Sequence, residues 1–313
     1  LTIEAFVRRV TETRKRQQTE RFVFPLLDTH TPEPLLWSFP VPRAVSLLTR
    51  TPSRHPPRSA SQLFFARDSD ESMDRARHRV PNTTPDATAY LLRDWCTSSE
   101  EEYLLGRVYH GGASGKKKST QVSGRRLQNL GGVVHPKGLI PTPMPEWLAT
   151  VAANVRASAG DLLPAPINHV LVTEYQPGDG ILPHQDGDAY YPAVAIVSLG
   201  CDAVMRFAPR RDDLEEGKGN ESEGNESGQS SSRSFGVFLP RRSLLVFDGA
   251  LYERYLHGID ATREDVIDAT VANRGDVEPA PTTTSLSLRR EKVRVSLTFR
   301  NVRVVRRALR LFG

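Results

Sequence analysis

The stretch Arg294-Val295-Ser296-Leu297-Thr298-Phe299-Arg300 has the pattern of a β-strand. Apolar side chains alternate with polar ones, and successive residues of a strand point to opposite faces of its sheet. Both arginines therefore share one face with Ser296 and Thr298, while the apolar side chains form the other face. Two interpretations follow. Either the arginines bind a dicarboxylic acid through bidentate guanidinium contacts, or the segment is an edge strand whose arginines are solvated.

Short strand-like segments also precede this stretch, separated by turns rich in Gly and Pro. Such a series is typical of a sandwich or a barrel. The predicted strands are residues 89–92, 169–175, 193–199, 204–207, 235–239, 243–247 and 293–299, and helices are predicted at residues 98–108 and 145–156. We therefore expect a mainly β protein with flanking helices.

A second motif, Ile181-Leu182-Pro183-His184-Gln185-Asp186-Gly187, places a histidine two residues before an aspartate. On a strand these two side chains would lie on the same face. His257, arriving from a distant strand, would complete a set of two histidines and one carboxylate, which is the set that non-haem Fe(II) oxygenases use. So short a motif also arises by chance. The alternative is that His184 lies at a surface turn and His257 is a hydrogen-bonded core residue.

The composition limits the class of protein. The 313 residues are 25% charged and 38% hydrophobic, which is ordinary for a soluble catalytic domain with extra segments. No apolar run approaches the roughly 18 residues that span a bilayer, and the first twenty residues lack the apolar core of a secretory signal. Cys96 and Cys201 are too few for a disulfide framework or a thiolate zinc site. We therefore expect an intracellular protein of the nucleus or the cytoplasm.

Three regions are predicted along the chain. Residues 1–85 contain all of the excess positive charge that gives the chain its net charge of +5. We expect them to be a basic, mostly disordered extension. Nucleic acid or an organelle import receptor would also suit such charge. Residues 86–165 form an N-terminal part with the helices, and residues 166–307 form the core. Within the core we expect two mobile insertions, at residues 211–234 and 261–291.

Together the motifs resemble the AlkB family of Fe(II)- and 2-oxoglutarate-dependent dioxygenases. The resemblance covers roughly residues 87–307 and includes the His-x-Asp motif, the distant histidine and the arginine strand. It extends over an ordered series of further segments: Ser123-Gly124-Arg125-Arg126-Leu127-Gln128-Asn129, Gly131-Gly132, Asn168-His169-Val170-Leu171-Val172, Tyr190-Tyr191-Pro192, Ser198-Leu199-Gly200, Pro240-Arg241-Arg242-Ser243-Leu244-Leu245-Val246 and Leu256-His257-Gly258-Ile259.

The resemblance implies a double-stranded β-helix, a jelly roll with iron at its open end, and 2-oxoglutarate and O2 as co-substrates. It implies that the metal ligands are His184, Asp186 and His257. It also implies a co-substrate site in which Arg294 and Tyr175 hold the distal carboxylate, with Arg300 near the keto-acid end or an iron ligand. Ser296 belongs to the same expected site, as does Thr173, which stands where the family often has Asn. Since a hydroxyl still forms hydrogen bonds, we expect altered contacts rather than loss of binding.

Family analogy implies alkylated nucleic acid as the substrate, with N-methyl groups hydroxylated and lost as formaldehyde. Residues 121–132 correspond to a flap that covers the nucleotide. Within it we expect Arg125 and Arg126 to contact phosphates and Gln128 and Asn129 to lie near a base, with Lys116, Lys117 and Lys118 adding charge. Tyr190 could stack on a base or pack around the metal strand.

Other functions stay open on the sequence alone. The two flap arginines could instead be structural, each paired with a carboxylate. The chain could act on protein or on a small molecule, or could bind nucleic acid with little turnover. The intact triad and both strand arginines favour an enzyme.

Overall fold

The computed structural model describes residues 74–81, 83, 87–110, 120–122, 125–210, 233–278 and 285–306. All of these belong to one compact unit, residues 55–313. Most of the predicted N-terminal extension lies outside the described residues. So do the lysines of residues 116–118, residues 123–124 of the predicted flap and residues 211–232 of the first predicted insertion. None of the described helices is long and apolar enough to cross a membrane.

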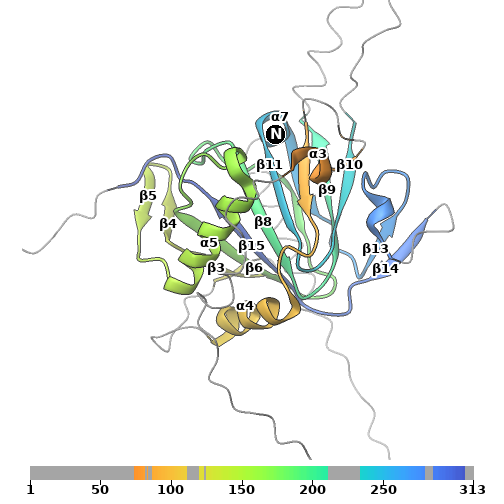
Figure 1. The fold of residues 1–313 in the computed structure, drawn as a ribbon, viewed down its shortest axis with the longest axis horizontal. Coiled ribbons are helices and arrows are strands. Elements are labelled where there is room, and N and C mark those ends of the chain that lie inside the picture. Colours follow the sequence, from red (N-terminus) through yellow and green to blue (C-terminus); the bar gives the residue numbers. More distant parts are fainter. Residues whose placement is uncertain are drawn as a thin grey trace, which may run out of the picture. The chain divides into compact units, whose positions relative to one another are not determined.

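Two antiparallel sheets form the core of the fold (Figure 1). The larger has seven strands in the order β1-β11-β8-β15-β6-β3-β2, and the smaller has four in the order β10-β9-β12-β7. The strands of the large sheet are β1 (Ala89–Leu92), β2 (Thr120–Val122), β3 (Arg125–Leu130), β6 (His169–Tyr175), β8 (Ala193–Leu199), β11 (Leu244–Asp248) and β15 (Arg294–Arg300). Those of the small sheet are β7 (Ile181–His184), β9 (Ala203–Pro209), β10 (Phe235–Leu239) and β12 (Tyr255–Ile259).

The inner faces of the two sheets share one apolar core. Ile196 of β8 and Phe247 of β11 meet Phe207 of β9 and Leu239 of β10 there. Phe207 packs edge-on against Phe247 with ring centroids 5.3 Å apart. Two sheets closed over a common core make the expected jelly-roll sandwich.

Two helices cover the outer face of the large sheet (Figure 1). α4 (Ser98–His110) and α5 (Glu146–Ala159) pack Leu104 and Val151 against Val172 and Leu297 in a second apolar cluster. α4 begins with a capping box, in which the Glu100 amide donates to Thr97 Oγ1 and the Thr97 amide donates to the Glu100 carboxylate. The sequence predicted the α4 start at this point.

β15 lies at the centre of the large sheet rather than at its edge. It pairs with β8 on one side and with β6 on the other. Its apolar residues Val295, Leu297 and Phe299 enter the outer core beneath the helices, so both arginines face the space between the sheets. Arg294 is 3% and Arg300 is 6% exposed. The interpretation as an edge strand with solvated arginines is therefore wrong.

The remaining elements are short. They are the helices α3 (Arg75–His78) and α7 (Gly249–Glu253), the 3-10 turns η1 (Gly160–Leu162) and η2 (Arg274–Asp276), the hairpin β4 (Gly132–His135) with β5 (Gly138–Pro141), and the pair β13 (Glu264–Ile267) with β14 (Leu286–Arg289).

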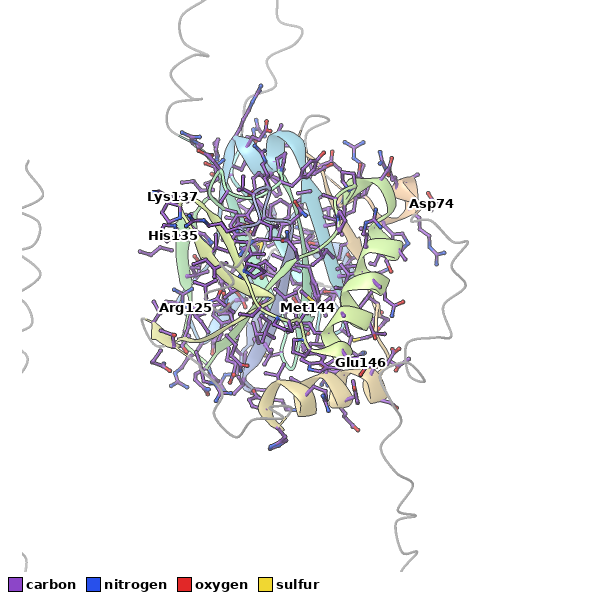
Figure 2. All side chains as sticks on the ribbon, turned by 90° about the vertical axis from the view of Figure 1, so that its left-hand side faces the viewer. Asp74, Arg125, His135, Lys137, Met144 and Glu146 are labelled. Atoms are coloured by element: carbon purple, nitrogen blue, oxygen red, sulfur yellow. The ribbon has the colours of Figure 1, made fainter. Side chains whose placement is uncertain are left out.

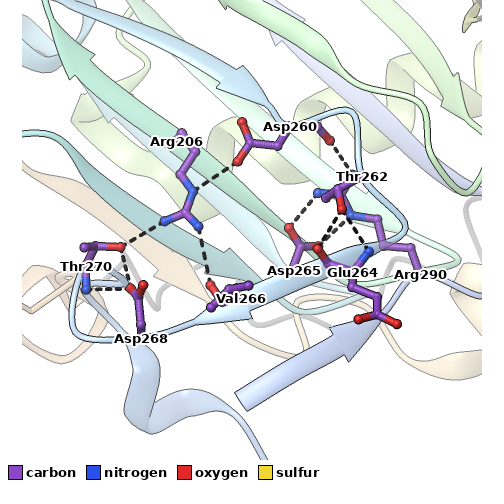
Figure 3. A network of polar contacts seen from close by, with 9 residues as sticks. All are labelled: Arg206, Asp260, Thr262, Glu264, Asp265, Val266, Asp268, Thr270 and Arg290. Carbon is purple, nitrogen blue, oxygen red and sulfur yellow. Dashed lines mark hydrogen bonds and ion pairs between the residues drawn. The ribbon is translucent and has the colours of Figure 1, made fainter. Parts of the chain in front are cut away.

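β13 and β14 belong to the insertion at residues 261–291, which we expected to be mobile. Its described part contains a buried ion pair between Arg290 and Asp265, with two hydrogen bonds of 2.6 Å. Arg290 also donates to the backbone carbonyl of Asp260, and Arg206 of β9 donates to Thr270 and to Val266 (Figure 3). The mixed polar composition of the segment reflects this network.

Candidate metal centre

Three side chains that could bind one metal ion meet where β7 and β12 run side by side. His184 ends β7, Asp186 follows two residues later, and His257 lies in β12 as the register partner of His184. One potential ligand atom from each of the three lies within 4.8 Å of the others. The sequence predicted all three residues, but Asp186 is in the loop after β7 and not on the strand itself.

Gly258 allows β12 to lie this close to β7. A Cβ atom at this position would come within 2.8 Å of the carbonyl oxygen of Ile181, closer than real side-chain carbons approach. The absence of a side chain therefore lets the strand that carries His257 pack against the strand that carries His184.

His257 is held in the neutral form that a metal requires. Burial lowers the pKa of this imidazole to about 4, because the charged form loses its hydration in the core. The rings of Phe247 and Phe207 lie 5.4 and 6.2 Å from it, centroid to centroid. At neutral pH its nitrogen lone pair is free of a proton.

His184 has a defined tautomer. Its Nδ1 lies 2.9 Å from the carbonyl oxygen of Leu182. Since a carbonyl only accepts, Nδ1 carries the hydrogen and Nε2 offers its lone pair. The His184 and His257 rings lie 4.5 Å apart.

Asp186 is fixed by Arg300 from the opposite sheet. The guanidinium donates from Nε to Oδ2 at 2.8 Å and from Nη2 to Oδ1 at 2.5 Å. Both side chains are buried, and the Tyr190 ring lies 4.9 Å from the guanidinium carbon. Each carboxylate oxygen still has a free lone pair, so the pair orients Asp186 without blocking it.

The loop that carries Asp186 is also anchored to α7. Gln185, between the two motif residues, donates to the backbone carbonyls of Tyr252 and Glu253. The Tyr252 hydroxyl donates in turn to the Asp186 carbonyl at 3.3 Å. Nothing in the sequence pattern indicated these anchors, because both partners lie in a short helix far along the chain.

Arg294 is a buried cation that lacks a carboxylate partner among the described residues. It donates from Nη2 to Ser198 Oγ at 2.9 Å, while its Nε has no hydrogen-bond partner there. Burial lowers the pKa of this guanidinium below its usual value. An unpaired buried charge is costly, so the site is chemically suited to an anionic ligand such as a carboxylate.

The other residues predicted for the co-substrate surround Arg294. Tyr175 is its register partner on β6, and the guanidinium carbon lies 5.4 Å from the tyrosine ring. Thr173 and Ser296 are also register partners, both buried, two residues further along the same face. Ser198, which holds Arg294, was missed, because a serine within an apolar strand gives no separate signal.

The predicted substrate residues divide between the two faces of β3. The register pairs Arg126 with Glu174, Gln128 with Val172 and Asn129 with Leu171. Arg126 donates to Glu174 at 2.7 Å on the helix-covered face, and Gln128 is buried on that face. Both side chains thus lie on the face away from the metal site, and Arg126 has the paired carboxylate that the structural alternative expected. Their contact with nucleic acid stays a prediction.

Arg125 and Asn129 lie on the inner face, which Tyr190 also approaches. Asn129 Oδ1 lies 3.1 Å from Nε2 of His169, a buried histidine that the sequence did not single out. Burial lowers the pKa of His169 to about 4, so Nε2 carries the neutral ring's hydrogen and donates it to the amide oxygen. The Tyr190 ring lies 5.9 Å from this histidine.

Comparison with known proteins agrees with this geometry. The profile of the 2OG-Fe(II) oxygenase superfamily matches residues 81–300. The probable RNA/DNA demethylase ALKBH6 of Danio rerio is 36% identical over 224 residues, which are 69% of this chain and 90% of that protein. The tRNA (carboxymethyluridine(34)-5-O)-methyltransferase ALKBH8 of Mus musculus is 27% identical over 68% of this chain but only 30% of its own length. The solved structure of OsALKBH1 has 19% identity and a TM-score of 0.42, covering 70% of this chain and 98% of that one. The chain thus belongs to the AlkB family within the 2OG-Fe(II) oxygenase superfamily, whose members are dioxygenases that use Fe(II), 2-oxoglutarate and O2.

Proposed function

We propose that this dioxygenase oxidatively demethylates alkylated nucleic acid, with Fe(II) bound by His184, Asp186 and His257. One observation carries the enzyme site. The same inner sheet face presents Arg300, bound to the carboxylate of the triad, and Arg294, a buried cation without a carboxylate partner among the described residues. A metal ion would bind at the Arg300 end of this face, next to Asp186, and a dicarboxylate ligand would pair with Arg294 at the other end.

The bound Fe(II), with 2-oxoglutarate and O2, supplies the oxidation of a substrate C–H bond, coupled to the decarboxylation of 2-oxoglutarate to succinate. The protein's own contribution is orientation. His184 presents Nε2 because Leu182 fixes its other nitrogen. His257 is neutral because it is buried, and Arg300 aims the Asp186 carboxylate.

Arg294 would hold the distal carboxylate of 2-oxoglutarate by a charge-assisted contact. The Tyr175 hydroxyl and the hydroxyls of Thr173 and Ser296 would supply neutral hydrogen bonds. In support, all four residues belong to directly paired positions of β6 and β15 and all are buried. Burial strengthens such contacts and keeps water out of the site.

Nucleic acid is favoured as the substrate by the relatives, one of which is named a probable RNA/DNA demethylase and another a tRNA methyltransferase. Tyr190 supplies an aromatic ring on the inner side of the sheet, next to Arg300 and His169, the kind of group that stacks on a base. Hydroxylation of an N-methyl group gives an N-hydroxymethyl group, which releases formaldehyde and leaves the N–H base. We further propose that the protein works in the nucleus or cytoplasm.

The deciding experiment incubates the Fe(II)-loaded protein with 2-oxoglutarate and oligonucleotides that each carry one methylated base. Mass spectrometry then follows loss of the methyl group, and succinate and formaldehyde are measured in parallel. Demethylation of RNA or DNA with one succinate formed per methyl group lost supports the proposal. The other outcome is that no oligonucleotide stimulates succinate formation, whereas a protein or a small molecule does. The substrate class proposed here would then be wrong, and the assignment as a dioxygenase would be unaffected.

A further inference from the structure

Tyr175 lies between two arginines that come from the strands on either side of β6. Arg294 of β15 has its guanidinium carbon 5.4 Å from the centre of the tyrosine ring, and Arg125 of β3 has its own at 6.0 Å. Both distances are within the range of cation–π attraction. The tyrosine is 8% exposed, so these contacts are largely shielded from water.

Arg125 points inward, unlike its neighbour Arg126. Its Nε is fully buried and has no hydrogen-bond partner among the described residues. No carboxylate of those residues forms an ion pair with it, whereas Arg126 has Glu174 on the other face of the sheet. Figure 2 shows Arg125 on the same side of the molecule as His135 and Lys137, and its strand β3 is next to the edge strand β2 of the large sheet. A surface contact with phosphate does not explain a buried Nε, but stacking on Tyr175 does.

The tyrosine ring links Arg125 to the expected co-substrate. Tyr175 and Arg294 are directly paired residues of β6 and β15, and the guanidinium carbon lies 5.4 Å from the tyrosine ring. The tyrosine therefore lies beside the place where an anion would bind Arg294. A ring attracted by a cation on its other flank has fewer orientations available, so its hydroxyl stays at that place.

We propose that Arg125 is a positioning residue for 2-oxoglutarate. By stacking on Tyr175 it holds the phenol toward the carboxylate that Arg294 binds, and it thereby couples the β2–β3 hairpin to co-substrate affinity. The inference rests on the proposed function of the Arg294 site. The family analogy assigns this hairpin to nucleotide binding, whereas the inference gives one of its residues a role in co-substrate binding.

The first test is equilibrium binding of 2-oxoglutarate to the full-length protein loaded with Mn(II), which replaces Fe(II) without turnover, measured by calorimetry. Arg125→Gln should weaken binding about three- to thirtyfold, the range of a shielded cation–π contact, and Arg125→Lys should recover part of the loss because it keeps the cation. Lys137→Gln, which removes one exposed charge from the nearby β4–β5 hairpin, should leave binding unchanged. Wild-type affinity in Arg125→Gln overturns the inference, as does an equal loss in Lys137→Gln.

A double-mutant cycle with Tyr175→Phe separates positioning from direct contact. The phenylalanine keeps the ring and removes the hydroxyl that Arg125 is inferred to orient. Adding Arg125→Gln to Tyr175→Phe should then cost little further affinity. A full additional loss would mean that Arg125 contacts the ligand itself and would overturn the positioning role.

Turnover gives an independent readout. Arg125→Gln should raise the KM for 2-oxoglutarate with little change in kcat, whereas a lowered kcat at unchanged KM contradicts the inference. Circular dichroism establishes that each variant is folded, and Arg125→Lys carries the test where the glutamine variant does not fold. Folded wild-type protein that binds no 2-oxoglutarate in the presence of metal overturns the proposed function itself, whereas loss of the Arg125 effect alone overturns only this inference.

Discussion

Arg300 binds both carboxylate oxygens of Asp186 across 114 residues of sequence and from the opposite sheet. The aspartate sits in a loop, where a side chain has more freedom than on a strand. The arginine, rigid within the central strand of the large sheet, removes that freedom. The geometry of the metal site therefore depends on a residue that would not itself touch the metal.

Arg300→Lys should weaken metal binding by about 10- to 100-fold, the usual cost of losing a group that orients a ligand. Lysine keeps the charge but binds one oxygen at a time. The measurement is an anaerobic Fe(II) titration, with Arg303→Lys, exposed on the segment that follows β15, as the matched control. Unchanged affinity in Arg300→Lys would show that Asp186 needs no orientation from this side.

His184→Ala should abolish Fe(II)-dependent formation of succinate from 2-oxoglutarate while leaving the fold intact. The side chain is only half-buried at the end of β7, so its removal leaves little cavity. Succinate assay and thermal melting measure the two effects, and His135→Ala at the exposed end of β4 serves as control. Full turnover by the variant would place the metal elsewhere.

Arg294→Met should separate function from stability. Loss of the guanidinium should raise the 2-oxoglutarate requirement by roughly 30-fold or more, because a charge-assisted contact to a carboxylate is worth about 2 kcal/mol or more. Without ligand, the variant should melt no lower than the wild type, since replacing an unpaired buried cation by an apolar side chain removes a cost. Arg289→Met, at an exposed position of β14, is the control. A large loss of ligand-free stability would mean that Arg294 has a structural partner.

Acid should destabilise the ligand-free protein through His169. Burial holds its pKa at about 4 in the folded state, against 6.5 for a solvated histidine. Between these values the unfolded chain binds the proton and the folded one does not, so stability falls as the pH drops from about 6.5 to 4 and then levels off. This difference in pKa corresponds to about 3 kcal/mol at most.

Urea unfolding between pH 4 and 7.5 checks this effect. His169→Gln keeps an amide donor for Asn129 and cannot titrate, so the pH dependence should become shallower in this variant. The remaining dependence should come from His257, whose pKa burial also lowers to about 4. His135→Gln, at an exposed position, should retain the wild-type slope. A slope of wild-type steepness in His169→Gln would assign the acid sensitivity to other groups.

The buried Asp265–Arg290 pair should make the free energy of unfolding of the whole core depend on the described part of the insertion. Arg290→Met leaves a buried carboxylate alone and should cost about 3–5 kcal/mol. The double variant with Asp265→Leu should recover most of that loss, because both charges are then gone. Chemical denaturation measures both variants. Equal stability of Arg290→Met and wild type would instead support the expectation of a loosely held insertion.

Short apolar or alternating runs between turns rich in Gly and Pro identified the strands that lie in the middle of the fold. β6, β8 and β10 have the predicted bounds, and β15 is shifted by a single residue. These strands are buried on one or both faces, so their patterns are strong. β7, β13 and β14 are only four residues long and partly exposed, which is too short for a pattern to indicate a strand.

β3 shows why the substrate residues could not be placed. Its apolar residues, Leu127 and Leu130, are three positions apart and so lie on opposite faces of the strand, giving no sign of which face is inward. Only pairing with β6 decides that Arg125 faces the site and Arg126 the helices. By contrast, three apolar residues at alternate positions gave the correct face for Arg294 and Arg300.

The two histidines of the triad belong to the small sheet, while the aspartate between them is tied to the large sheet by Arg300. A metal ion bound by all three side chains would connect the two sheets at the open end of the sandwich. Metal binding would then increase the free energy needed to separate the two sheets. The metal concentration would therefore determine how long the two sheets stay together, in addition to whether the enzyme is active.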